Sequence, residues 1–213
     1  MDTDALIDAL ARDTAPVPRH AAPLRLGLSL AAAMAATLVV IAALLGFRPD
    51  LDLAMAGTMF WMKLAYTGSL ALVGITALLT LIRPEARPPR WLWLLTIPVA
   101  LLGLVSANEL ADMPHDDRMA MLLGESWQVC SPLIAVFAVP IAGALVLIVR
   151  RFAPTRLRAT GAVIGLAAGA ASATVYSLHC PEAAASFVLT WYSLGIAAST
   201  ALGWALGPKL LRW

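Results

Sequence analysis

The sequence is poor in charged residues. Asp, Glu, Lys and Arg make up 13% of its 213 residues, whereas hydrophobic residues make up 61%. A typical soluble domain has about 25% charged and about 45–50% apolar residues. The mean hydropathy is +0.82. This composition excludes an ordinary water-soluble domain and predicts an integral membrane protein.

The motifs of common enzyme active sites are also missing. The sequence has no Gly-rich phosphate-binding loop, no H-E-x-x-H and no G-x-S-x-G. No carboxylate pair lies inside its long apolar runs, and no basic groove interleaved with aromatic residues is present. We therefore expect no catalysis, no cofactor and no direct contact with nucleic acid.

A cleavable secretory signal is missing as well. Such a signal has a short apolar region directly before its cleavage site. Here several acidic residues precede the first long apolar run instead. They are Asp2, Asp4, Asp8 and Asp13. We therefore expect the first apolar run to be a retained helix.

Six long apolar runs fill most of the chain. A helix needs about 20 mostly apolar residues to cross a bilayer core, and these runs are apolar on all sides. They cover residues 26–47, 59–82, 91–107, 130–149, 157–178 and 185–206. The sequence thus predicts an all-α polytopic protein. A six-helix transmembrane domain, residues 24–213, follows a short segment, residues 1–23.

The basic residues are distributed unevenly between the two sides. If residues 1–23 are cytoplasmic, 12 of the 15 basic residues lie on the inner side, and only Arg48, Lys63 and Arg118 lie on the outer side. The inner ones are Arg12, Arg19, Arg25, Arg83, Arg87, Arg90, Arg150, Arg151, Arg156, Arg158, Lys209 and Arg212. This is the positive-inside pattern, and six spans then place both termini in the cytoplasm. We expect the basic loops to contact anionic membrane lipid.

The segment before the first run has the pattern of a short amphipathic helix. Leu6, Ile7 and Leu10 share one face, and Asp4 and Asp8 lie toward the other. Such a short helix is marginal alone in water. An acidic face is repelled by anionic lipid, so we favour docking in the groove of a protein whose surface is basic over a position on the inner leaflet. The residues expected to end this helix are Pro16 and Pro18.

Small residues recur every four positions in the last two runs. The fifth run has Gly161, Gly165 and Gly169, and the sixth has Gly195, Ser199, Gly203 and Gly207. Small residues on one helix face allow two backbones to approach closely in a membrane. We therefore expect the fifth and sixth helices to pack tightly, against each other or against neighbouring helices.

The two cysteines fall at the same end of the predicted spans. Cys130 opens the fourth span and Cys180 follows the fifth, so both face the outer side. Three interpretations remain open: a structural disulfide, a pair that responds to oxidants or binds a soft metal, and two unrelated buried thiols. His179 adjoins Cys180 and is either a third ligand or a polar residue at the interface. The spacing matches no compact zinc motif and no C-x-x-C motif.

Lys63 is a charged residue inside an apolar run. It lies close to the outer end of the second run. Charges within a span are often functional, but a lysine near a helix end has a stem long enough to reach the headgroups. We expect Lys63 to extend its ammonium to the outer headgroups.

Several stretches resemble a known family. They are the His-Cys-Pro-Glu stretch at 179–182, the Trp-Tyr-Ser-Leu-Gly stretch at 191–195, the Leu-Arg-Trp end at 211–213 and the Trp-Met-Lys-Leu-Ala-Tyr stretch at 61–66. With the short acidic and apolar N-terminus, they resemble the NrsF family, the negative regulators of sigma F. Its members are six-span membrane anti-sigma factors of proteobacteria. The resemblance covers nearly the full length of the chain.

The resemblance implies a function for both ends of the molecule. Residues 1–23 would hold an extracytoplasmic-function sigma factor away from core RNA polymerase at the bacterial inner membrane. Cys130 and Cys180 would be the periplasmic pair needed for the response to heavy-metal or oxidative stress. The residues expected to contact the sigma factor are Leu6, Ile7, Leu10, Asp4 and Asp8.

Two other functions remain possible at the level of sequence. A small membrane transporter or metal-efflux protein needs polar residues at mid-span, and the chain offers only mild ones, namely Thr76, Thr80 and Ser172. A membrane thiol oxidoreductase usually has a close cysteine pair and a cofactor site, and neither is evident in the sequence. The resemblance favours the anti-sigma factor over both.

Overall fold

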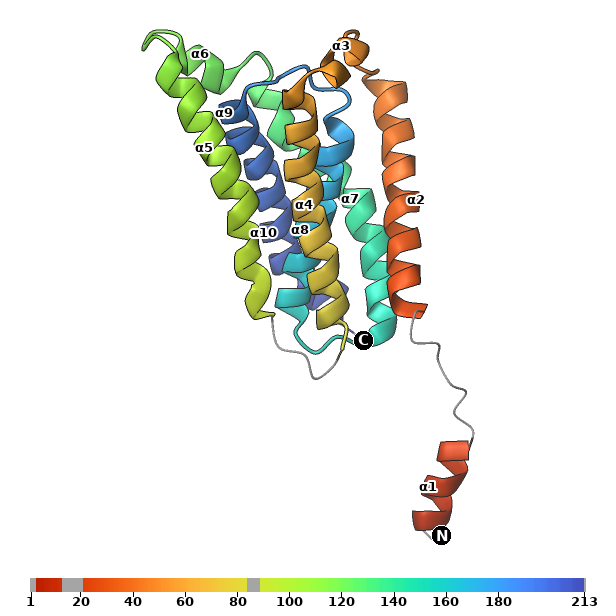
Figure 1. The fold of residues 1–213 in the computed structure, drawn as a ribbon. Helices are drawn as coiled ribbons and strands as arrows, with labels where there is room; N and C mark the ends of the chain where they lie inside the picture. Colours follow the sequence, from red (N-terminus) through yellow and green to blue (C-terminus); the bar gives the residue numbers. More distant parts are fainter. Residues whose placement is uncertain (1–2, 13–20, 84–88, 213) are drawn as a thin grey trace.

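The computed structural model describes residues 3–12, 21–83 and 89–212, and within these ranges it is helical with no strand (Figure 1). Six helices are long and apolar enough to cross a membrane. This confirms the predicted all-α class with six candidate spans. Their bounds are α2 (Ala21–Leu44), α4 (Thr58–Leu81), η1 and α5 (Arg90–Leu95 and Thr96–Asp112), α6 to η2 (Arg118–Phe152, with α7 at Trp127–Val149), α8 (Leu157–Tyr176), and α9 to α10 (Ala185–Leu210).

The connections gather at two opposite ends of the bundle. One end has α3 (Leu51–Ala56), α6 (Arg118–Leu123) and the loop 177–184, and we call it the thiol end because Cys180 lies there (Figure 1). The start of α2, the end of α10 and the turn after α7 lie at the other end, which we call the basic end. The first and last spans thus begin and end on the same side, as an even number of crossings requires.

The third helix extends beyond its apolar run. The run was predicted to end at residue 107, whereas α5 continues to Asp112 and includes Glu109. A charged residue ends an apolar run, but it does not end a helix. The helix stops just before Pro114, which disfavours helical conformation in the residue before it.

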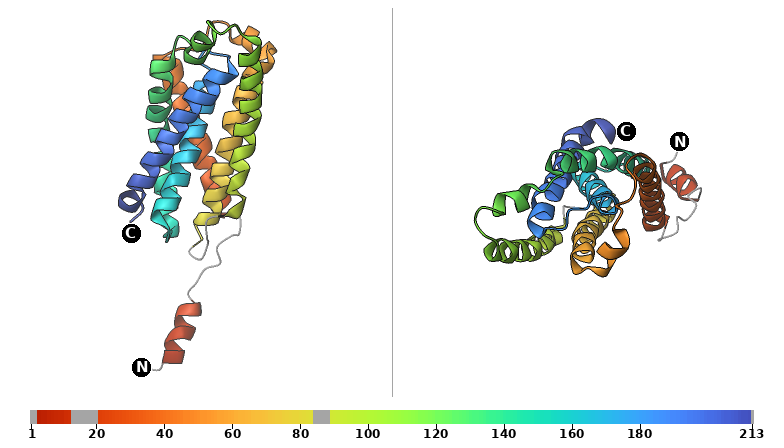
Figure 2. Two further views of the ribbon diagram at one scale, coloured as in Figure 1. Left: turned by 90° about the vertical axis from the view of Figure 1, so that its left-hand side faces the viewer. Right: turned by 90° about the horizontal axis from the view of Figure 1, so that it is seen from above.

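Helix α8 lies at the centre of the bundle and packs against α10, α4 and α7 (Figure 2). Its glycines bring it close to α10. A Cβ atom added at Gly161 would collide with the carbonyl oxygen of Gly203, and one added at Gly165 would collide with that of Ser199. The predicted tight packing of the fifth and sixth helices is confirmed, and the two helices pack against each other.

The last span begins with an irregular turn. The short helix α9 (Ala185–Phe187) leads into a π-helical turn, η3 (Val188–Tyr192), before α10 (Ser193–Leu210) continues as a regular α-helix. Trp191 in this turn donates its indole N–H to the carbonyl of Leu122, at 2.9 Å. The Ser131 hydroxyl of α7 donates to the carbonyl of Trp191, at 2.6 Å. The π turn is therefore joined to both α6 and α7.

Helix α1 spans Thr3–Arg12 and buries none of its residues. The side chains of Leu6, Ile7 and Leu10 are all exposed. The helix thus forms where the sequence predicts one, with its apolar face uncovered. The predictions that involve Asp2, Asp13, Pro16, Pro18, Arg19, Arg87 and Trp213 lie outside the described residues.

Candidate thiol site

The two cysteines meet at the thiol end. Cys130 is in the first turn of α7 and Cys180 is in the loop after α8, and their Sγ atoms lie 3.6 Å apart. Both are free thiols, and their residues are 0% and 1% exposed. A disulfide needs a separation of about 2.0 Å. The structure therefore brings together two sulfurs that are 50 residues apart in the chain, in the reduced state and within a small displacement of bonding.

Hydroxyl groups surround the sulfur of Cys130. The Ser126 Oγ atom lies 3.2 Å from the Cys130 sulfur and 4.0 Å from that of Cys180. The Tyr176 hydroxyl, from the last residue of α8, lies 3.5 Å from the Cys130 sulfur. The thiols therefore lie in a buried environment that still contains polar partners from three segments of the chain.

Glu182 joins the loop 177–184 to the start of α7. Its Oε1 atom accepts hydrogen bonds from the backbone N–H groups of Glu125 (2.8 Å) and Ser126 (3.3 Å) and from the Ser126 hydroxyl (3.2 Å). Gly124 makes this approach possible. It has φ +56°, and a Cβ atom there would lie only 2.7 Å from Glu182 Oε2. A carboxylate is well suited to the free N–H groups at a helix start.

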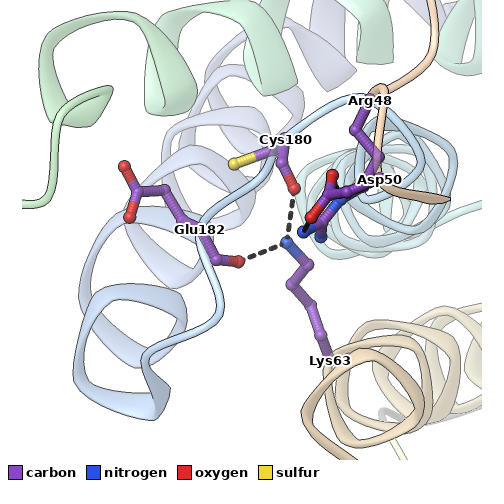
Figure 3. Close-up of polar contacts among 5 residues, drawn as sticks. All are labelled: Arg48, Asp50, Lys63, Cys180 and Glu182. Atoms are coloured by element: carbon purple, nitrogen blue, oxygen red, sulfur yellow. Dashed lines mark hydrogen bonds and ion pairs between the residues drawn. The ribbon is translucent and has the colours of Figure 1, made fainter. Parts of the chain in front are cut away.

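Lys63 is buried beneath the same loop. It is 2% exposed, and its Nζ atom donates hydrogen bonds to the carbonyls of Cys180 (3.1 Å) and Glu182 (2.8 Å) (Figure 3). The prediction that Lys63 reaches the outer headgroups is therefore wrong. Residue 63 lies more than one turn inside α4, and the loop supplies two carbonyl oxygens within hydrogen-bond distance of its ammonium. Its ammonium also lies 5.1 Å from the ring centroid of Tyr192.

His179 connects the loop to the residues that follow α2. Its Nδ1 atom lies 2.9 Å from the carbonyl oxygen of Gly46, so Nδ1 carries the proton in this bond. The backbone N–H of Arg48 donates to the carbonyl of Leu178, at 3.2 Å. Gly46 itself has φ +78° and ends α2 with a left-handed residue. His179 is thus used as a link between two segments.

The described residues form no group of three or more His, Cys, Asp or Glu side chains that could hold a metal ion. His179, which the sequence offered as a third ligand, forms a hydrogen bond with the carbonyl of Gly46 rather than with a thiol. A soft metal at this site would therefore have the sulfurs of Cys130 and Cys180 as its protein donors.

The C-terminal end of the loop 177–184 is held by a side chain of α5. The Glu109 Oε2 atom accepts a hydrogen bond from the backbone N–H of Ala185, the first residue of α9, at 2.8 Å. Together with Lys63, Glu182 and His179, this contact attaches the loop 177–184 to α4, α5, α7 and the residues after α2. The cysteine-bearing loop is thus the point at which most of the bundle is linked by side chains.

A hydrogen bond and a nearby charge favour the ionised form of Cys180. The hydrogen bond from the Cys130 thiol lowers the pKa of Cys180 most, burial raises it, and the charge of Lys63 lowers it further. The net result is a pKa of Cys180 well below its ordinary value. Nearby, Asp50 lies 2.7 Å from Arg48, which lowers the pKa of Asp50 through its hydrogen bond and raises the pKa of Arg48. The surroundings of Cys180 therefore favour its thiolate, which is the nucleophilic form of a cysteine.

Mid-span hydroxyls are occupied by backbone contacts. Thr76 and Thr80 donate to carbonyls of their own helix, at 2.8 and 3.2 Å, and Ser172 of α8 donates to the carbonyl of Ile134 in α7, at 2.8 Å. These three residues were the polar candidates for a transport path. Their donors are directed into helix backbones, so they serve packing in this structure.

Sequence reasoning identified both cysteines but missed the groups that hold them. Lys63 was interpreted as a headgroup contact, and no role was assigned to Ser126 or Tyr176. A signal for Lys63 was present, because a lysine five residues inside an apolar span is rare. Tyr176 lies 46 residues from Cys130, so no local signal marked it. Ser126 lies only four residues before Cys130, but its bond to Glu182 joins residues 56 positions apart.

These features define a polytopic α-helical membrane protein with a reduced thiol pair held under a loop at one end. A search of protein families assigns the chain more narrowly. It belongs to the family of negative regulators of sigma F, because the NrsF family model, "Negative regulator of sigma F", matches residues 10–213. The family is regulatory rather than enzymatic.

Two curated relatives match over all of both chains. The chain is 39% identical to the "Anti-sigma-F factor NrsF" of Caulobacter vibrioides over 217 residues. It is 37% identical to the "Probable anti-sigma-F factor NrsF" of Azospira oryzae over 213 residues. No solved structure matches the chain.

Proposed function

We propose that this protein is an anti-sigma factor of the bacterial inner membrane. It sequesters an extracytoplasmic-function sigma factor through its N-terminal segment and releases it when the Cys130–Cys180 pair reacts with an oxidant or a heavy metal. Family membership over residues 10–213 and two full-length relatives named as anti-sigma-F factors support the regulatory class. The observation that carries the sensing step is the 3.6 Å separation of two buried, reduced sulfurs.

The exposed apolar face of α1 supports the binding step. Leu6, Ile7 and Leu10 are 42%, 58% and 63% exposed, and no residue of α1 is buried. An amphipathic helix with spaced apolar anchors is suited to a hydrophobic groove on a partner protein. The exposed Asp4 and Asp8 favour a partner whose groove is bordered by basic residues. A sigma factor held in this way at the membrane is kept from RNA polymerase.

The distribution of charge supports the orientation. Arg83, Arg90, Arg150, Arg158 and Lys209 are among the basic residues at or next to the basic end. Under the positive-inside rule this end faces the cytoplasm, where it contacts anionic lipid and where α1 meets its partner. The thiol end then faces the oxidising periplasm, where a disulfide is stable. Sensing and sequestration would thus occur on opposite sides of the membrane.

The contacts of the loop 177–184 supply a physical route between the two sides. His179 and Leu178 are bonded to Gly46 and Arg48, which follow directly on α2. Helix α2 runs from there to Ala21, close in sequence to the N-terminal segment. A change at Cys180 that moves this loop therefore also moves α2, which behaves as a rigid rod. A coupling of about 1–3 kcal/mol would change the affinity for the sigma factor about 5–150-fold.

The sensing step is tested by Cys130→Ser and Cys180→Ser in cells that report sigma-factor activity. We expect both variants to insert normally and to lose most of the response to a peroxide or a thiol-binding metal. Met113→Ser is the control, since it alters a sulfur-containing residue of another loop at the same end. A full response in both cysteine variants would contradict the proposal.

The binding step is tested separately by Leu6→Asp and Leu10→Asp. Each places a charge on the apolar face of α1, and we expect each to release the sigma factor from membranes and to activate its target genes without a stressor. Thr3→Asp, at the start of the same helix, is the control because it leaves that face intact. The proposal fails if a chain without residues 2–15 still retains the sigma factor at the membrane.

A further inference from the structure

Lys63 is a buried cation without a carboxylate partner. Within the described part of the chain no carboxylate lies within ion-pair distance of its Nζ atom, and the ion pair at this end joins Arg48 to Asp50. The side chain of Glu182 does not supply one. Its carboxylate points away from Lys63 and toward the start of α7, and only its backbone carbonyl accepts from the ammonium (Figure 3). Lys63 therefore meets carbonyl oxygens and the face of an aromatic ring.

A buried ammonium of this kind is costly. Removal of a charge from water is only partly offset by neutral dipoles, and a charge within a span is stabilised by an anion nearby. The ionisable groups that face this position come from every element packed around it. They are Cys180 and Glu182 of the loop, Cys130 of α7, Tyr192 of η3, and Arg48 after α2. Around the thiols lie also Tyr176 of α8, beside the Cys130 sulfur, and His179, which is bonded to Gly46. Of these, Cys180 bears one of the two carbonyls that Lys63 binds.

We infer that Lys63 is the positioning residue and counter-charge of the thiol pair: it fixes the backbone on both sides of Pro181 and holds Cys180 as the attacking thiolate beside the Cys130 thiol. The inference rests on the proposed function, since it assigns roles within the same sensor. Two observations carry it independently of any titration. Lys63 binds the carbonyls of the residues before and after Pro181, and it is a buried cation with no carboxylate partner in the described chain. The lowered pKa of Cys180 agrees with this assignment.

A cavity of about 120 Å³ lies beside Lys63 and is lined by Arg48, Gly57, Phe60 and Glu182 among others. Neither sulfur lines it, and both sulfurs are buried, so a reagent reaches them only when the loop moves. A peroxide is small and needs only a small opening, and Lys63 beneath the loop would stabilise the anionic leaving group.

The reaction with hydrogen peroxide balances as follows. The Cys180 thiolate attacks one peroxide oxygen, an S–O bond forms, the O–O bond breaks and hydroxide leaves. The sulfur of Cys130 then attacks the sulfur of the resulting sulfenic acid, an S–S bond forms, the S–O bond breaks and the Cys130 proton leaves with the hydroxyl group as water. Two electrons from the two sulfurs reduce the peroxide. The negative charge at Cys180 is lost, so Lys63 is left without its counter-charge.

The test follows Cys180 in the full-length reduced protein in detergent micelles. Sulfenic acid formation with hydrogen peroxide is measured by mass spectrometry in a Cys130→Ser background, with and without Lys63→Met, over a range of pH from about 5 to about 9. We expect Lys63→Met to move the midpoint of the rate profile upward by about 1–3 pH units, the usual effect of losing one neighbouring opposite charge. At about pH 6, a midpoint that starts near 5 then gives a rate about 2- to 100-fold lower.

Two variants serve as controls. Lys63→Arg retains the charge and should retain most of the lowered midpoint. Lys209→Met removes the chain's other lysine, which is exposed at the basic end, and should leave the profile unchanged. An unchanged midpoint in Lys63→Met would overturn the inference. If Lys63→Met does not fold, Lys63→Gln takes its place, because its amide can still donate to the two carbonyls without the charge, and an unchanged midpoint in that variant would overturn the inference.

The outcome is separable from that of the proposed function. These rates are measured without a sigma factor, so they report only on the chemistry at Cys180. If the cysteine variants respond normally in cells, the proposed sensor fails whatever the rates are. If those variants are unresponsive but Lys63→Met leaves the profile unchanged, the sensor stands and the role assigned to Lys63 fails.

Discussion

Toward the basic end, α8 and α10 meet through glycine and serine backbones, whereas at the thiol end the loop between them is held by side-chain hydrogen bonds. Gly161 and Gly165 allow no atom between the two helices. Lys63, Glu182 and His179 instead reach the loop from three directions. Steric contact between backbones is insensitive to pH, charge and redox state. The molecule therefore combines a region of fixed packing with a region whose contacts depend on the chemical state of two sulfurs.

The largest effect is expected where the backbones touch. Gly165→Ala places a methyl group against the carbonyl of Ser199 and forces α8 away from α10. We expect a destabilisation of about 2–3 kcal/mol, as for other overpacked sites, and a clear fall in the thermal midpoint in detergent. Gly143→Ala is the matched control, since a methyl group there would have no neighbour within 4 Å. Equal midpoints for the two variants would remove the distinction between the two regions.

A smaller effect is expected from the carboxylate that joins the loop to α7. Glu182→Ala removes the acceptor for two backbone N–H groups and one hydroxyl, which corresponds to about 1–2 kcal/mol for a helix cap. Glu182→Gln retains an acceptor and should restore part of the loss. Glu125→Ala changes an exposed neighbour and should be neutral. Thermal unfolding of the reduced protein measures all three, and a neutral Glu182→Ala would show that the loop is held without this contact.

His179→Ala should separate sensing from signalling. It removes one hydrogen bond to Gly46, which costs about 1 kcal/mol. We expect the thiols to oxidise at the normal rate in the purified protein while the cellular response is reduced, because the loop loses one of its two hydrogen bonds to the residues after α2. His115→Ala, in an exposed position, is the control. A normal cellular response in His179→Ala would argue against the route through α2.

The smallest effect is expected at the Arg48–Asp50 pair. Its two hydrogen bonds of 2.7 and 2.8 Å lie at the surface, where such pairs add little stability. Because the pKa of Asp50 is lowered, its contribution is present above the unfolded value of about 3.9 and is lost only as pH falls through the lower folded value. Asp50→Asn should therefore leave the thermal midpoint unchanged, equally at about pH 5 and at about pH 8. A clear fall in the midpoint at both pH values would show a larger role for the pair.

The helices and the shared end of the cysteines were predictable because their signals are local or topological. A run of apolar residues marks a span wherever it lies, and counting the spans places Cys130 and Cys180 at one end. Close approach of α8 and α10 followed from the spacing of their glycines. None of these conclusions needs the register between helices. The assignment to a family followed from residues such as those at 179–182 and was supported by the family model.

The surroundings of the thiols were not predictable for the converse reason. Lys63 binds the backbone carbonyls of residues 180 and 182, and carbonyls are identical at every position of a sequence. The hydrogen bond from His179 to Gly46 also has a backbone carbonyl as its acceptor. No characteristic residue pattern marks the π turn at Val188–Tyr192 in the sequence. Each depends on how distant segments are aligned, which hydropathy does not encode.

That π turn also bears on how related chains are compared. A turn of this kind holds one residue more than the α-helical turn it replaces, and each residue of an α-helix rotates the chain by about 100°. Deletion of a single residue between 188 and 192 would rotate Trp191 away from Leu122 and Ser131. The packing of α8 against α10 would keep its register. An alignment gap at this point would therefore signal an altered fold around the cysteines in that relative, even where both sulfurs are retained.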